Sequence, residues 1–143
     1  MNTKYIKLFL RLSIAIGFLS AVADRFGLYA KETSAWGNWQ TFADYTQQMN
    51  PWFPKSVTPT LAILATALEI IFAISLLIGF KTELFAKLSG VLVLLFGFSM
   101  SFAFGVKPAL DYSVFAVSAA AFALGTMQNK YLEIDSFISK KVN

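Results

Sequence analysis

The chain has 143 residues, of which 57% are hydrophobic and 14% charged, and its formal net charge is +4. Soluble domains average about 25% charged residues, so this composition and a mean hydropathy of +0.61 indicate a membrane protein with a single domain over residues 1–143. The absence of cysteine and histidine excludes disulfides and thiolate metal sites built from this chain, excludes a histidine-based catalytic triad, and removes the usual zinc and haem ligands. The basic residues lie at the ends of apolar runs, a placement that favours membrane topology over nucleic-acid binding.

The first apolar run predicts a transmembrane helix over residues 5–23. Ser13, Gly17 and Ala21 recur at every fourth position, which places small residues on one face and favours close helix packing. The alternative is a secretory signal peptide, because basic residues precede the run and residues 21–23 read Ala-Val-Ala, an A-x-A cleavage pattern. We expect a retained helix, since three further apolar runs follow it.

A long loop over residues 24–60 separates this helix from the next apolar run, and its composition is polar and aromatic. Within the loop we expect an amphipathic helix over residues 35–49, with Ser34 as its N-cap and Pro51 just beyond its end. Spacings of four, three, four and three residues place on one face Ala35, Trp39, Phe42, Thr46 and Met49.

Three tryptophans lie in or beside this predicted helix: Trp36, Trp39 and Trp52. Tryptophan is enriched at the headgroup level of membranes, where its ring is apolar and its N–H can reach water. We therefore expect the helix to lie at the membrane–water interface, as a lid or anchor over the mouth of a helix bundle. The alternative is a gate for a substrate or a partner.

Three further apolar runs predict transmembrane helices over residues 61–80, 84–104 and 109–127, joined by short polar turns. Short connections make neighbouring helices antiparallel. The sequence therefore predicts an all-α fold, an integral membrane four-helix antiparallel bundle with the amphipathic helix as an extra interfacial element.

The distribution of lysine and arginine predicts the orientation, because cytoplasmic segments of membrane proteins carry the excess. With the N-terminus inside, the cytoplasmic set is Lys4, Lys7, Arg11, Lys81, Lys87, Lys130, Lys140 and Lys141. The opposite set is Arg25, Lys31, Lys55 and Lys107. We expect both termini in the cytoplasm.

Glu69 is the one ionisable side chain in the run over residues 61–80, and it lies near the middle. A charge at that depth costs about 2.5–3.5 kcal/mol on insertion scales, so we expect Glu69 to face the bundle interior, with Thr66 on the same face. Arg11 is its candidate partner, because a rise of about 1.5 Å per residue puts the two at depths that an arginine side chain can bridge.

Several roles remain open for this predicted pair. It either fixes the register of two helices or serves as a ligand site or proton relay. A third possibility is an Arg11 side chain that snorkels to the interface beside a protonated Glu69.

A second polar group is predicted at the opposite membrane face. Its members are Asp24, Arg25, Lys107 and Asp111. Together with the three tryptophans they would frame a polar pocket under an aromatic cover; the alternative is a set of solvated helix ends, since exposed ion pairs contribute little. The sequence predicts no metal site and no catalytic residues.

Several short motifs resemble the DoxX-like family of small bacterial membrane proteins. They are Leu10-Arg11-Leu12, Phe18 and Asp24-Arg25; Glu69 and the Leu-Leu-Ile-Gly-Phe-Lys-Thr stretch over residues 76–82; and Gly125, Asn129-Lys130-Tyr131 and Ile134-Asp135. The resemblance implies a four-helix protein of the bacterial cytoplasmic (inner) membrane. Some members of the family are subunits of quinone-linked oxidoreductases, so the resemblance makes quinone the candidate cofactor.

The leading hypothesis is therefore a non-catalytic or quinone-associated membrane subunit, with the lipid bilayer, oxidoreductase subunits or further copies of itself as partners. The alternative from another class is a small transporter or channel in which Glu69 is an intramembrane relay or ligand site. A third hypothesis is a purely structural membrane module.

Overall fold

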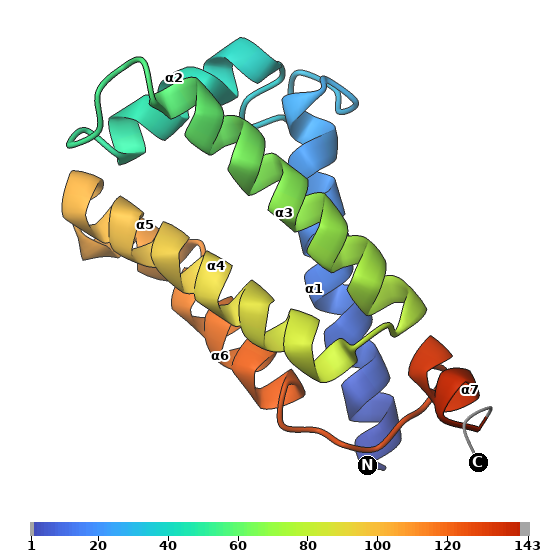
Figure 1. The fold of residues 1–143 in the computed structure, drawn as a ribbon. Coiled ribbons are helices and arrows are strands. Elements are labelled where there is room, and N and C mark those ends of the chain that lie inside the picture. Colours follow the sequence, from blue (N-terminus) through green and yellow to red (C-terminus); the bar gives the residue numbers. More distant parts are fainter. Residues whose placement is uncertain (1, 141–143) are drawn as a thin grey trace.

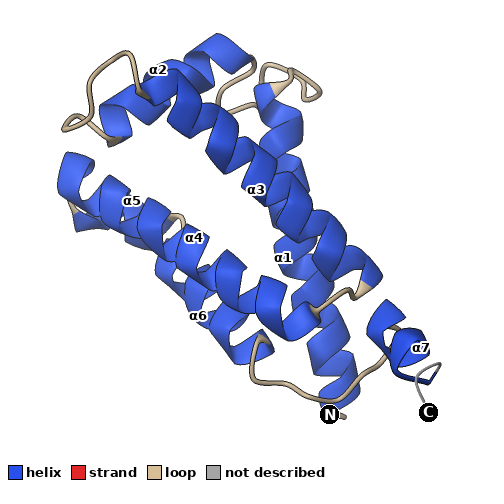
Figure 2. Cartoon of the chain, viewed as in Figure 1, coloured by secondary structure: helices blue, strands red, loops and turns tan. Residues whose placement is uncertain are grey.

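The computed structural model describes residues 2–140, so Met1 and residues 141–143, including Lys141 of the orientation count, lie outside the described part. Within that part every regular element is an α-helix (Figure 2). Three helices are long and apolar enough to cross a membrane: α1 (Thr3–Arg25), α3 (Thr58–Ile78) and α4 (Thr82–Phe104). The predicted all-α membrane class is thereby confirmed.

The ends of these helices follow local signals in the sequence. The side chain of Asn2 accepts a hydrogen bond from the backbone N–H of Lys4 and caps α1. Pro59 lies in the first turn of α3, where backbone N–H groups make no hydrogen bond within the helix, so its lack of an N–H costs nothing there. Gly79 adopts a left-handed conformation with φ of 71° and ends α3 two residues before the predicted boundary at residue 80.

The amphipathic helix in the first loop is shorter than the predicted segment over residues 35–49. Helix α2 spans Trp39–Met49, because Asn38 caps it and its side chain accepts from the N–H of Thr41 at 2.9 Å. The predicted N-cap Ser34 is wrong, since its hydroxyl instead donates to the carboxylate of Asp24. The predicted inner face is confirmed in part: Phe42, Thr46 and Met49 are buried, whereas Trp39 is half-buried and Ala35, before α2, is exposed.

The predicted helix over residues 109–127 is divided in the structure. Helix α5 spans Val106–Asp111 and helix α6 spans Val114–Leu124. Between them Ser113 adopts a left-handed conformation with φ of 56°, which the right-handed helix cannot continue. A last short helix, α7 (Ile134–Lys140), lies in the C-terminal tail.

The long helices pack as two pairs, α1 against α3 and α4 against α6, as Figure 1 shows. The main core includes Ile14 and Phe18 of α1, Phe72 and Leu76 of α3, and Val93 of α4. Helix α2 packs against α3 and α4 at the end where α1 finishes and α3 begins. The two pairs thus share one core, with α2 across one end of it.

Glycines on α4 allow aromatic rings of the α6 segment to approach its backbone. A Cβ on Gly90 would lie 3.0 Å from the ring of Phe122, and one on Gly97 would lie 2.9 Å from the ring of Phe115. Gly17 on α1 differs, because a Cβ there would meet no atom within 4 Å. Small residues therefore serve close packing on α4 and not, within this chain, at Gly17.

We predict opposite outcomes for the same substitution at two of these glycines. Gly97→Leu should destabilise the protein by about 1–3 kcal/mol, because the new side chain must displace the Phe115 ring. Gly17→Leu should leave stability unchanged or slightly higher, because it faces open space and leucine is the better helix former. Thermal unfolding in detergent, followed by circular dichroism, measures both. Equal losses would contradict this account of the α4–α6 contact.

Candidate functional site

Glu69 forms a buried ion pair with Arg25, which lies at the end of α1. Arg25 Nη2 donates to Glu69 Oε1 at 3.0 Å, and Nη1 lies 2.5 Å from Oε2. The side chains are 3% and 2% exposed, respectively, so both charges lie out of solvent. Charges buried in this way need a close partner of opposite charge, and Arg25 and Glu69 are partners of each other.

Thr66 completes the polar contacts of the pair. It lies one turn before Glu69 on α3, and its hydroxyl accepts a hydrogen bond from Arg25 Nη1 at 2.7 Å. The same hydroxyl donates to the backbone carbonyl of Ala62 at 2.9 Å, which fixes its orientation. The predicted interior placement of Glu69 and Thr66 on one face of the helix therefore agrees with the geometry.

Aromatic rings cover the guanidinium of Arg25. Its central carbon lies 3.8 Å from the ring centroid of Phe42 and 5.3 Å from that of Trp36. Trp36 packs edge-on against Phe42, and Trp39 stacks on Phe26 beside them. A cation over desolvated aromatic faces is stabilised by about 2 kcal/mol or more, so these rings favour burial of the arginine.

The predicted Arg11–Glu69 pair is wrong. Arg11 lies at the other end of the α1–α3 pair, where its Nε donates to the carbonyl oxygen of Leu76 at 2.9 Å and its Nη2 to that of Leu77 at 3.1 Å. These carbonyls lie in the last turn of α3, where backbone oxygens have no helical partner. Glu69 lies two turns earlier on α3, and the end of α1 supplies Arg25 to it.

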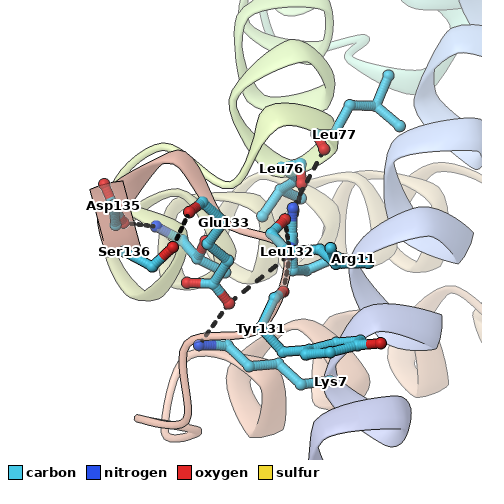
Figure 3. Close-up of polar contacts among 10 residues, drawn as sticks. Lys7, Arg11, Leu76, Leu77, Tyr131, Leu132, Glu133, Asp135 and Ser136 are labelled. Carbon is cyan, nitrogen blue, oxygen red and sulfur yellow. Dashed lines mark hydrogen bonds and ion pairs between the residues drawn. The ribbon is translucent and has the colours of Figure 1, made fainter. Parts of the chain in front are cut away.

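Arg11 instead joins a second buried cluster with the C-terminal tail, drawn in Figure 3. Its Nη1 donates to the carbonyl oxygens of Tyr131 and Leu132, both at 3.0 Å. Glu133 approaches the same region, with Oε1 2.8 Å from Lys7 Nζ and 3.7 Å from Arg11 Nη1. Lys7, Arg11 and Glu133 are all at most 1% exposed, so the tail is fastened by buried charge.

Glu133, Lys7 and the partner role of Arg25 are not part of the site that the sequence predicts. Glu133 carried a signal, since it is a single acid between apolar Leu132 and Ile134 at the start of an amphipathic stretch. Arg25 carried a weaker signal, since a basic residue at a helix end is most often solvated.

The structure divides the predicted outer polar cluster into separate parts. Asp24 accepts hydrogen bonds from the Ser34 hydroxyl and from the backbone N–H groups of Ala35 and Trp36, at 2.9 and 3.0 Å for the two amides. Arg25 belongs to the Glu69 pair instead. Of the three tryptophans in the predicted aromatic cover, Trp36 lies over this arginine, and the second ring over it is that of Phe42.

The other half of that predicted cluster lies apart from the pair. Lys107 and Asp111 bind each other, Nζ to Oδ2 at 2.6 Å, as an exposed pair one turn apart on α5. Trp52 also lies apart, packing edge-on against Phe102 of α4 with half of its surface exposed. For Lys107 and Asp111 the structure agrees with the alternative of solvated helix ends.

The arrangement at Glu69 can position and neutralise charge inside the helix bundle. Both carboxylate oxygens face Arg25, and Arg25 Nε is left without a hydrogen-bond partner in the described part of the protein. Among residues 2–140 no group of three or more acidic side chains could hold a metal ion. The site is therefore an electrostatic and structural centre built from Arg25, Glu69 and Thr66.

Comparison with known proteins identifies one family. The family model described as DoxX matches residues 6–103, a stretch that contains Arg11, Asp24, Arg25, Thr66 and Glu69. The matched stretch covers more than half of the chain and ends before α5. No curated protein and no solved structure matches this chain.

A double-mutant cycle should identify Arg25 as the partner of Glu69. We expect Arg25→Ala alone to cost about 3–5 kcal/mol, because Glu69 then remains buried without its partner. Combined with Glu69→Ala, it should show a coupling of about 0.5–3 kcal/mol in denaturant unfolding.

The matched cycle pairs Arg11→Ala with Glu69→Ala. Arg11 and Glu69 share no contact, so their effects should add to within about 0.3–0.5 kcal/mol. A larger coupling for Arg11 than for Arg25 would contradict the assignment.

The role of Arg11 in holding the tail predicts a protease-sensitive variant. Arg11→Lys keeps the charge but removes the planar group that donates to four carbonyl oxygens. We expect the free energy that keeps the tail docked against α1 to fall by about 1.5–3 kcal/mol. Limited proteolysis with mass spectrometry should detect faster cleavage near Tyr131. Arg25→Lys is the matched control, because it alters the only other arginine and leaves the tail contacts intact.

Proposed function

Because the chain belongs to the DoxX family, we propose that it is a non-catalytic, quinone-associated membrane subunit of an oxidoreductase complex. The observation that carries the proposal is the buried Arg25–Glu69 ion pair, in which each charged group neutralises the other inside the bundle. A pair of this kind shapes and rigidifies a scaffold, while a partner supplies the redox chemistry. The lack of cysteine and histidine in the chain also supports a scaffold role for this chain and a redox role for its partner.

We place the protein in the bacterial cytoplasmic membrane as a four-span antiparallel bundle with both termini in the cytoplasm. Helices α1, α3 and α4 are the first three spans, and α5 with α6 forms a broken fourth span against α4. Helix α2 then lies at the opposite interface, where Trp36 and Trp39 suit the headgroup level. The distribution of lysine and arginine supports this orientation.

A groove on the side of α4 supports the association with quinone. It is an open groove of about 620 Å³, within the usual range for small-molecule sites, and its lining is mostly apolar and aromatic. Ser99 is the hydroxyl-bearing residue of its lining, and this hydroxyl donates to the side chain of Asn50 at 3.0 Å. The lining residues are Pro51, Trp52, Leu95, Phe98, Ser99 and Phe102. A flat ring with a prenyl chain fits walls of this chemistry.

The alternative of a transporter or channel fits the site less well. A proton relay needs a carboxylate that exchanges protons with water along a path. Glu69 is 2% exposed, and both of its oxygens face Arg25. The geometry therefore favours an anchoring role over a relay.

The test is mild-detergent purification of the tagged protein from its native membranes. We expect quinone in the organic extract, together with a flavin, haem or iron–sulfur partner that reduces or oxidises quinone. Ser99→Phe should lower the bound quinone severalfold by filling the groove, whereas Leu64→Phe, on an exposed face of α3, should not. A preparation free of quinone and redox partners would overturn the proposal. Proton flux through liposomes that contain this chain alone would favour the transporter instead.

A further inference from the structure

The segment between α1 and α2, residues 26–38, forms a compact loop whose two ends meet. Gly27 and Gly37 have φ of 71° and 70°, in the left-handed region that glycine adopts without strain. A Cβ on Gly27 would lie 3.0 Å from the carbonyl oxygen of Gly37, so the ends of the loop touch there. Compact surface loops whose ends lie close together are frequently functional.

Three hydrogen bonds from this loop converge on a single carboxylate. Asp24, in the last turn of α1, accepts from the hydroxyl of Ser34 and from the backbone N–H groups of Ala35 and Trp36. The loop has little core of its own, because residues 26–33 are all exposed. Two other side-chain contacts join it to α1 in the described structure: an exposed hydrogen bond of 2.8 Å between Ser20 and Tyr29, and the Trp36 ring against the guanidinium of Arg25.

The same loop places Trp36 over the candidate functional site. The indole lies against the guanidinium of Arg25, which is paired with Glu69. Asp24 and Arg25 are adjacent in sequence, so one residue holds the loop while the next holds the pair beneath it. Displacing residues 34–36 would remove one of the two rings that lie over the guanidinium of Arg25.

A furrow of about 480 Å³ follows the seam between this loop and α1. Gly17, Ser20 and Ala21 form its α1 side, and Tyr29 and Thr33 form its loop side. Asp24 also lines the furrow. Small side chains on one wall leave the loop room to shift along this seam.

We propose that residues 26–38 are a lid that controls the access of water and small polar solutes to the buried Arg25–Glu69 pair, and that Asp24 is the latch that keeps the lid closed. Asp24 is a positioning residue, acting on the pair through the backbone of Trp36. The proposal goes beyond the oxidoreductase assignment and does not depend on it, because access is a property of the isolated chain.

Cysteine labelling tests the lid directly, since the chain contains no cysteine of its own. Thr66→Cys places a thiol beside the pair, and a small hydrophilic maleimide in detergent solution reports its exposure. Ala73→Cys, fully buried two turns further along α3, reports any general loosening of the bundle. Leu28→Cys, at a position 76% exposed, gives the rate for an open site.

With Asp24 intact, the Thr66→Cys protein should label far more slowly than the Leu28→Cys protein. Adding Asp24→Ala should raise the rate at Thr66→Cys at least about tenfold, the factor that corresponds to about 1.4 kcal/mol. The rate at Ala73→Cys should not change. Asp44→Ala is the charge control, because Asp44 is exposed on α2 and binds only Gln40 in the described structure.

Three results would overturn the proposal: an unchanged rate at Thr66→Cys with Asp24→Ala, equal acceleration at Ala73→Cys, or fast labelling with Asp24 intact. If Asp24→Ala fails to fold, Ser34→Ala and Asp24→Asn decide instead, since each removes only part of the latch. Those variants should then give intermediate rates, and rates equal to the parent would count against the lid. Asp24→Glu, which keeps the carboxylate, should restore slower labelling than Asp24→Ala.

Discussion

The arrangement of this protein depends on the ion pair between Arg25 and Glu69. It ties the end of α1 to the middle of α3, with both side chains withdrawn from solvent. Withdrawing either charge alone would cost several kcal/mol, so the pair holds only while the two helices keep their relative position. Arginine suits this role better than lysine, because its planar group contacts Glu69, Thr66 and the ring of Phe42 at once.

The two arginines of the chain fasten the α1–α3 pair at opposite ends by different chemistry. Arg25 meets a carboxylate, whereas Arg11 meets backbone carbonyls of the last turn of α3 and of the tail. The α4–α6 pair relies instead on glycines that admit aromatic rings, together with a hydrogen bond of 2.8 Å from Ser118 to the carbonyl of Gly90. One half of the bundle is thus held by buried charge and the other by close apolar packing.

The sequence predicts the helices and the interior placement of Glu69 and Thr66, but not the partners of the charged groups. Long apolar runs can be recognised directly in the sequence, and a single carboxylate within one is expected to face the interior because exposing it to lipid is costly. The choice between Arg11 and Arg25 depends on how α1 and α3 cross and on where α3 ends. Depth estimated from the ends of the apolar runs predicts that Arg11 lies near Glu69. In the structure Arg11 instead donates to the unpaired carbonyl oxygens of the last turn of α3, before Gly79. The burial of Glu133 depends on how the tail folds against Lys7 and Arg11 of α1, which the local sequence does not determine.

The adjacent residues Asp24 and Arg25 explain why the buried pair and its cover form together. A carboxylate and a guanidinium at consecutive positions of a helix point in different directions, since side chains advance by about 100° per residue. Asp24 is thereby directed to the loop and Arg25 to the interior. Trp36 contacts both residues, because its backbone N–H donates to Asp24 and its ring lies against the guanidinium of Arg25. The loop cannot leave Asp24 without altering the surroundings of Arg25. The loop and the charge in the middle of α3 are therefore linked through two consecutive residues of α1.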